Sequence, residues 1–181
     1  MSAAQIAWLG VAAVLAFWMV GAYNRLVDLR NKIAEAWQLV DEVLKQRGAA
    51  VAELVTALRG PLDAEQGALD ALLAAQAQVR AAADALGARP VVAALAGAVV
   101  SAETAMASAS ARVLSLLEAQ PALRGDAAIG PHAQVLRDSV QRLAFARQLF
   151  NDATQAYNAA ARQFPTRLLT RLYGFGTAGR L

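Results

Sequence analysis

The feature that most constrains this chain is a stretch near its N-terminus without a single charged residue. Residues 3–22 read AAQIAWLGVAAVLAFWMVGA. A helix of this length reaches about 30 Å, which is the thickness of the hydrocarbon core of a bilayer. Trp8 and Trp18 lie inside the stretch and Tyr23 follows it, where an amphipathic aromatic ring favours the membrane interface. We therefore predict a transmembrane anchor over residues 1–22.

A cleaved signal peptide is the alternative interpretation, because Val20-Gly21-Ala22 resembles a small-residue cleavage site. Against it, residues 1–4 contain no Lys or Arg, and the apolar run is longer than the usual h-region of about 7–15 residues. The anchor is the favoured interpretation. Basic residues crowd the stretch from Arg25 to Arg47, and cytoplasmic flanks carry the excess of Lys and Arg, so the body is expected on the cytoplasmic side.

Beyond the anchor the sequence predicts an all-α body. Strong helix formers dominate, and the period-two alternation of strands is nearly absent. Apolar residues recur every three or four positions from Ile33 to Leu58, with Arg47 as the one polar member of the series. We expect this helix to continue from the anchor without a break at Gly21 and to end at Gly60-Pro61.

Three more helices are predicted, over residues 63–86, 91–119 and 131–163, with a loop at 121–131. Helices joined by short connections pack antiparallel. The predicted architecture is thus an antiparallel four-helix bundle over residues 23–175, continuous with the anchor and followed by a short tail at 176–181. The second and third of its helices are so rich in Ala that their lateral face is a candidate contact surface.

The sequence offers no constellation typical of catalysis or metal binding. It contains 0 Cys and 1 His, so neither a thiol nucleophile nor a His pair is available. Gly174, Gly176 and Gly179 have no strand before them and no helix after them, unlike a phosphate-binding loop. The net charge of +3 is mild, and no basic stripe is interleaved with aromatics. We expect no enzymatic activity, cofactor, metal, nucleic acid or small-molecule substrate.

Candidate binding residues gather where the first helix leaves the membrane and the last helix returns to it, because an up-down bundle places these two ends side by side. Arg167 and Arg171 could bind anionic headgroups, or they could simply complement the helix dipole. Trp37 is either a core residue or an interface anchor. The candidate membrane-interface and binding residues are Trp18, Tyr23, Asn24, Arg25, Arg30, Trp37, Tyr157, Asn158, Phe164, Arg167, Arg171 and Phe175.

Two blocks of the sequence together resemble the LemA family. The first block is the apolar span followed by Tyr23-Asn24, Leu26, Leu29-Arg30-Asn31, Ala36-Trp37, Asp41 and Leu44-Lys45-Gln46-Arg47. The second block is Phe150-Asn151-Asp152-Ala153, Tyr157-Asn158, Phe164-Pro165, Leu168-Leu169 and Gly174-Phe175, and Pro121 with Leu123-Arg124 fits the P-x-L-R element of the family. The chain departs from the family pattern at Ser139-Val140, where a Thr-Glu pair is usual, and at Phe150-Asn151, where the family has Tyr-Asn.

The resemblance implies a membrane-anchored cytoplasmic four-helix domain of poorly defined activity, and one branch of the family is associated with building magnetosome membranes. On this basis the chain is expected in the bacterial inner membrane, as a single-pass protein with its bundle on the cytoplasmic side. The leading hypothesis is a scaffold, a self-assembling protein (homo-oligomer) or an accessory subunit of a partner membrane protein. The alternative hypothesis is peripheral binding of anionic or curved lipid surfaces through the basic, aromatic C-terminal segment.

Overall fold

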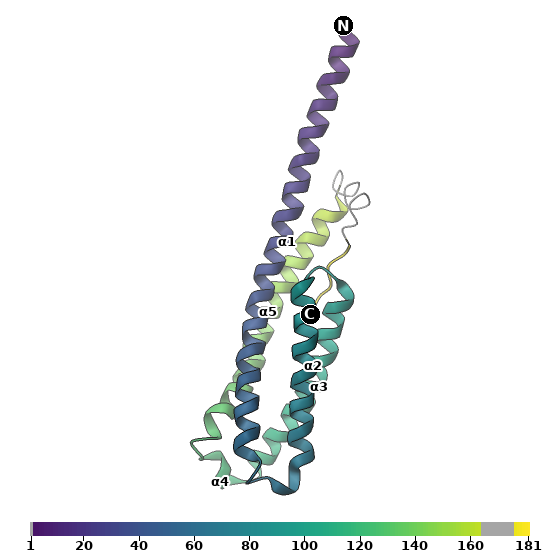
Figure 1. Cartoon of the computed structure of the whole chain (residues 1–181). Helices are drawn as coiled ribbons and strands as arrows, with labels where there is room; N and C mark the ends of the chain where they lie inside the picture. Colours follow the sequence, from purple (N-terminus) through teal and green to yellow (C-terminus); the bar gives the residue numbers. More distant parts are fainter. Residues whose placement is uncertain (1, 164–175) are drawn as a thin grey trace.

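The computed structural model describes residues 2–163 and 176–181, and helices make up most of them (Figure 1). In chain order these are α1 (Ala3–Leu58), the 3₁₀ turn η1 (Asp63–Glu65), α2 (Gln66–Ala88), α3 (Ala93–Glu118), α4 (Pro121–Arg124) and α5 (Gly130–Arg162). No strand occurs in the described part of the chain. The all-α class that the sequence predicts is therefore confirmed.

α1 is one unbroken helix of 56 residues, as the sequence predicts. A capping box begins it: the Ser2 hydroxyl accepts from the Gln5 N–H at 3.4 Å, and the Gln5 side chain accepts from the Ser2 N–H at 2.8 Å. Gly21 lies inside the helix without interrupting it, because one glycine costs only about 1 kcal/mol. The helix ends before Pro61, whose ring disfavours helical backbone at the residue before it.

The N-terminal part of α1 stands clear of the other helices (Figure 1). Its large apolar side chains are open to the surroundings, with Trp8 74% and Phe17 79% exposed. Among the side chains of α1 whose burial the structure describes, the first buried one is that of Leu26, where the packed body begins. Within the described residues, α1 is the one helix that is long and apolar enough to cross a membrane.

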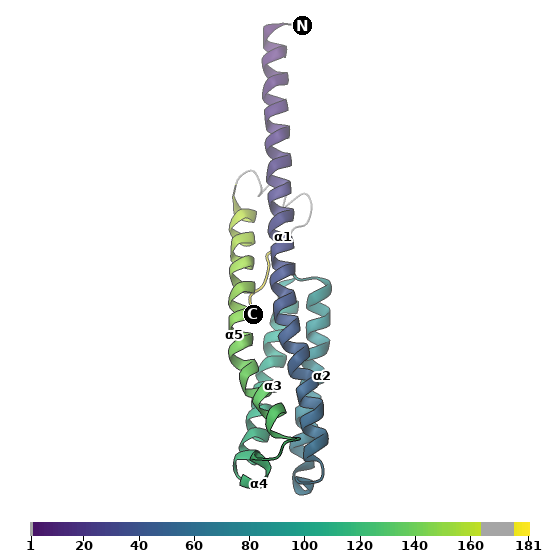
Figure 2. The same ribbon diagram turned by 90° about the vertical axis from the view of Figure 1, so that its left-hand side faces the viewer.

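The remainder of α1 packs with α2, α3 and α5, and consecutive long helices run in opposite directions (Figures 1 and 2). The most extensive packing is between α1 and α5, then between α2 and α3, with a smaller contact between α1 and α2. The backbones of α3 and α5 approach each other much less. The four long helices are therefore antiparallel, but the predicted four-helix bundle is not confirmed as an evenly closed arrangement.

The core follows the apolar series that the sequence predicts along α1. Buried positions in this series are Ile33, Trp37, Val40, Leu44, Arg47, Val51, Leu54 and Leu58. The Trp37 ring lies 6.0 Å from the Phe150 ring of α5 in an edge-to-face arrangement. Such a pair adds about 0.5–1.5 kcal/mol beyond the area that it buries. Aromatic packing thus joins α1 to α5 near the middle of the body.

A polar cluster at the surface holds α1 against α2. The Asp41 carboxylate of α1 lies 2.7 Å from Lys45 Nζ and 2.8 Å from Arg80 Nη2 of α2. Burial raises the pKa of the Asp41 carboxyl, but the hydrogen bonds and positive charges of Lys45 and Arg80 outweigh it and hold that pKa below its usual value. Asp41 is therefore a stable anion that fixes the register of the two helices.

The structure differs from the sequence prediction at the ends of the elements. The residues predicted to begin the second helix form the 3₁₀ turn η1, and α3 begins at Ala93 instead of residue 91. The predicted loop 121–131 contains the one-turn helix α4 and the start of α5. A proline in the first turn opens both α4 and α5, because its fixed φ suits that position.

Candidate functional site

One end of the body joins residues 25–30 of α1, where this helix enters the packed part of the structure, to the end of α5. Arg25 Nη1 donates to Gln163 Oε1 at 3.5 Å. Burial raises the pKa of the Tyr157 hydroxyl, and the charge of Arg30 opposes that rise only in part. Tyr23 and Asn24 are exposed on the same stretch of α1. The structure thus brings the Arg25–Arg30 segment beside the Tyr157–Gln163 segment.

The C-terminal residues return to α5 and are held there by two asparagines. The Asn158 side chain accepts from the N–H of Ala178 and donates to its carbonyl oxygen, both at 2.9 Å. Asn151 makes the same pair of bonds to Leu181, at 2.8 and 2.9 Å. Seven residues of helix rise about 10.5 Å, and three residues of extended chain span about 10 Å, so the two asparagines match the two backbone positions.

Two further contacts fix this segment. Tyr157 Oη donates to the carbonyl oxygen of Gly176 at 3.3 Å. Gly179 lies so close to the start of α3 that an added Cβ would come within 2.7 Å of Ala93 Cα. Ala178 is buried beside it. The sequence prediction treats residues 176–181 as a tail after the bundle, whereas these residues pack between α5 and α3.

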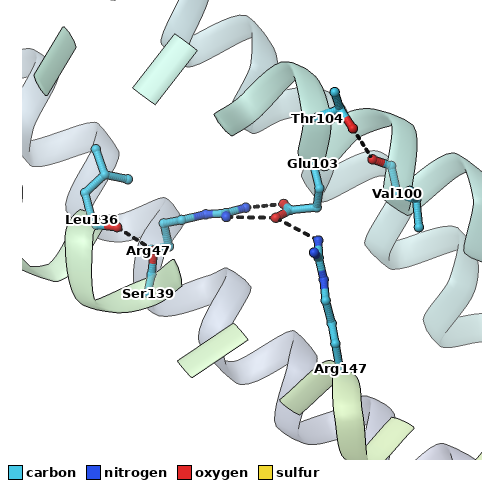
Figure 3. A network of polar contacts seen from close by, with 7 residues as sticks. All are labelled: Arg47, Val100, Glu103, Thr104, Leu136, Ser139 and Arg147. Carbon is cyan, nitrogen blue, oxygen red and sulfur yellow. Dashed lines mark hydrogen bonds and ion pairs between the residues drawn. The ribbon is translucent and has the colours of Figure 1, made fainter. Parts of the chain in front are cut away.

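A buried ionic network links α1, α3 and α5 (Figure 3). Arg47 of α1 makes a two-pronged pair with Glu103 of α3, in which Nη1 donates to Oε2 at 3.0 Å and Nη2 donates to Oε1. Arg147 of α5 donates from Nη2 to the same Glu103 Oε2 at 3.2 Å. The Arg47 and Glu103 side chains are only 7% and 8% exposed, and Arg147 is 30% exposed.

The network carries one more positive than negative charge. The Nε atoms of Arg47 and Arg147 are also buried without a hydrogen-bond acceptor among the described residues. Both arginines line a groove of about 450 Å³ between α3 and α5, where the two backbones lie apart. Its remaining walls are mainly apolar side chains, including Met106, Leu114 and Leu136. This groove is therefore electropositive at one end and apolar along its length.

The chemistry of this network is that of a structural brace. Both oxygens of Glu103 accept from guanidinium groups, which cannot release a proton near neutral pH. Ser139 lies in the same groove, but its hydroxyl donates to the Leu136 carbonyl at 2.7 Å within α5. In the described ranges, His, Asp and Glu side chains form no cluster of three that could hold a metal ion.

The positions of the sequence-predicted binding residues fall into three groups. Tyr23, Asn24, Arg25 and Arg30 lie on the stretch of α1 that meets the end of α5, where Tyr157 and Asn158 lie, and Trp18 lies on the exposed N-terminal part of α1. Trp37 is 5% exposed and packs on Phe150, so it is a core residue and its inclusion among surface binding residues is wrong. Phe164, Arg167, Arg171 and Phe175 lie outside the residues that the structure describes.

Sequence reasoning found only one member of the ionic network. Arg47 stands out as the polar member of an apolar series, which signals a buried charge in need of a partner. Glu103 carries a comparable signal that was missed, because it is the only charged residue in 93–111 and lies between Val99 and Met106 at helical spacing. Arg147 carries none, because it is one of several arginines on its helix. The paired use of Asn151 and Asn158 was likewise missed, although the two lie seven residues apart, two turns along one face.

The comparison with protein families gives one match. The model of the LemA family matches residues 36–180, which is most of the chain and includes the buried network, both asparagines and the C-terminal segment. No curated protein matches the chain.

Proposed function

The chain belongs to the LemA family, and on that premise we propose that it is a non-enzymatic scaffold or accessory subunit of the inner membrane. Its N-terminal helix crosses the bilayer once, and its helical body works on the cytoplasmic side through contacts with other proteins. Self-assembly is the form of contact that needs no further component.

The observation that carries this proposal is the continuity of α1. One helix passes from an uncharged stretch, whose Trp8 and Phe17 side chains are exposed, into a body whose first buried residue is Leu26. Exposed apolar area of that extent is unfavourable in water and favourable in lipid. An unbroken helix also holds the body at a fixed distance and orientation from the bilayer, which suits a protein that positions others.

The surface of the body supports a role in binding. Small side chains on the outer faces of α2 and α3 remain exposed, among them Ala74, Ala81, Ala94, Ala98 and Ala105. Small residues let another backbone approach closely. The buried network also braces three helices, so a partner would meet a body that does not need to reorganise.

Chemical crosslinking of the full chain in native membranes, followed by mass measurement, tests the proposal. We expect the protein to stay in the membrane pellet after carbonate extraction, and the crosslinked species to exceed the 18.9 kDa of one chain. Multiples of that mass indicate self-assembly, and other increments indicate an accessory subunit. A control chain without residues 2–22 should leave the pellet. A full-length protein that carbonate releases, or that stays at the mass of one chain, would contradict the proposal.

A second candidate function is the binding of anionic lipid by Arg167 and Arg171, which lie outside the described residues. This candidate is favoured by the positions of Gln163 and Gly176, the two described residues that flank the segment with Arg167 and Arg171. Gln163 bonds to Arg25 just after the span, and Gly176 bonds to Tyr157. Each basic residue near an anionic surface contributes about 1 kcal/mol. In the chain without residues 2–22, reversing both charges should weaken retention on anionic liposomes about tenfold or more, and in the full chain it should leave the crosslinked mass unchanged. Unchanged retention would remove this candidate.

A further inference from the structure

An apolar patch lies on the surface of the α1–α5 pair. Leu39 of α1 is 51% exposed and Phe145 of α5 is 68% exposed. Both side chains line a hollow of about 470 Å³, and all of its walls belong to α1 and α5. Two large apolar side chains that share one hollow form a patch, which marks an interaction surface more strongly than single scattered residues do. The exposed ring of Phe145 can act as a knob, and the hollow beside it can accept such a knob.

Two opposite charges flank the same hollow. Glu42 projects from α1 and Arg142 from α5, and both line its wall. Neither takes part in any ion pair found among the described residues. Glu42 instead accepts from Gln46 on its own helix at 2.7 Å. The patch is therefore apolar at its centre, with one negative side chain from α1 and one positive side chain from α5 on the wall of the same hollow.

A membrane anchor restricts how two copies of such a body can meet. Every copy enters the bilayer from the same side, so a twofold axis that relates two copies must run along the membrane normal, roughly parallel to α1. In a dimer with such an axis, each residue faces residues of the other copy that lie at the same distance from the membrane. A self-complementary patch must then hold opposite charges and a knob beside a hole within one short stretch of the body. Glu42, Arg142 and Phe145 meet this condition, because all three line the same hollow.

We propose that this patch joins two copies of the chain side by side in the membrane as a parallel twofold dimer. The inference rests on the proposed function and names the interface that self-assembly would use. Phe145 of each copy enters the hollow of the other beside Leu39, and Arg142 of each copy pairs with Glu42 of the other. The patch is small, but two tethered copies meet at a high effective concentration, so a modest contact suffices.

The chain contains 0 Cys, so single cysteines report on proximity without background. Gln141→Cys places a thiol on the wall of the hollow, and Ala74→Cys places one on an exposed face of α2. With the full chain in native membranes and a short bismaleimide, we expect Gln141→Cys to give a crosslinked dimer and Ala74→Cys to give little. Equal crosslinking at both positions, or none at Gln141→Cys, would overturn the proposal.

Substitutions in the Gln141→Cys background then test the chemistry of the patch. Phe145→Asp should lower the crosslinked fraction about tenfold or more, whereas Val140→Asp should lower it less than about twofold. Val140 is a matched control because it lies on the same helix, is also 68% exposed and does not line this hollow. Circular dichroism of each variant shows whether the helices remain. An intact Phe145→Asp variant that still crosslinks would count against the interface.

A charge exchange tests the proposed pairing even where one of the single variants folds poorly. Arg142→Glu and Glu42→Arg should each lower the crosslinked fraction, because like charges then face each other, and the double variant should restore it. Failure of the double variant to recover would contradict the proposed pairing.

Two outcomes separate this inference from the proposed function. If crosslinked masses in native membranes rise by amounts other than multiples of one chain, and Gln141→Cys gives no dimer, the interface alone is rejected. If carbonate releases the chain from the membrane, the proposed function is rejected as well.

Discussion

Replacing Glu103 with alanine is expected to destabilise the folded protein by about 3–5 kcal/mol, the cost of leaving a buried charge without its partner. The carboxylate of Glu103 is the only acceptor within the network, and both Arg47 and Arg147 donate to it. Without it two guanidinium groups stay close together, one of them only 7% exposed. Urea unfolding of the full chain in detergent, followed by circular dichroism, measures the effect.

Glu118→Ala is the matched control for this prediction. Glu118 lies on the same helix, its side chain is 63% exposed, and its carboxylate is 3.9 Å from Arg137. An exposed pair of this kind contributes about 0–1 kcal/mol, so its loss should be small. A double change of Arg47→Met and Glu103→Leu should recover most of the stability, because it removes both deeply buried charges and the guanidinium that is left, that of Arg147, is 30% exposed to solvent. Equal effects of Glu103→Ala and Glu118→Ala would show that the network contributes little.

Gly179→Ala is expected to displace the C-terminal residues from the bundle and to lower stability by about 1–3 kcal/mol. The added Cβ would lie 2.7 Å from Ala93 Cα and 3.0 Å from the Ala93 carbonyl oxygen, which are backbone atoms that cannot rotate away. The Asn158 bonds to Ala178 would then be lost with the segment. Hydrogen exchange at the amides of Ala178 and Leu181 should become fast in this variant.

Gly176→Ala provides the control in the same segment, because an added Cβ there meets nothing within 4 Å. Protection of the two amides should survive this change. Asn158→Ala should mimic the effect of Gly179→Ala on Ala178 by removing both of its hydrogen bonds. Full protection in both Gly179→Ala and Asn158→Ala would mean that the C-terminal segment is not held in the way described.

Both predictions concern features that make the body rigid. The network fixes α3 and α5 to α1 at a level where the α3 and α5 backbones lie apart. The C-terminal segment fills the space between α5 and the start of α3. Together they hold the α3–α5 side of the body, which has the least direct helix packing.

The sequence by itself determined the all-α class and the long apolar N-terminal helix that passes unbroken into the body. Periodicity fixes these because each depends on residues that are close along one helix, such as the series from Ile33 to Leu58. The sequence also marked Arg47 as the one polar member of an apolar series, and the burial of Trp37 agrees with the core interpretation that the sequence left open.

Only the tertiary structure decided which distant groups meet. Glu103 lies 56 residues from Arg47, and Ala178 lies 20 residues from Asn158, so no local pattern could pair them. The same holds for the hollow that Leu39 and Phe145 share, since each is a single apolar residue on an otherwise polar face. Helical periodicity states which side of a helix is buried, whereas the rotation and spacing of helices against one another follow from the packing of all side chains at once.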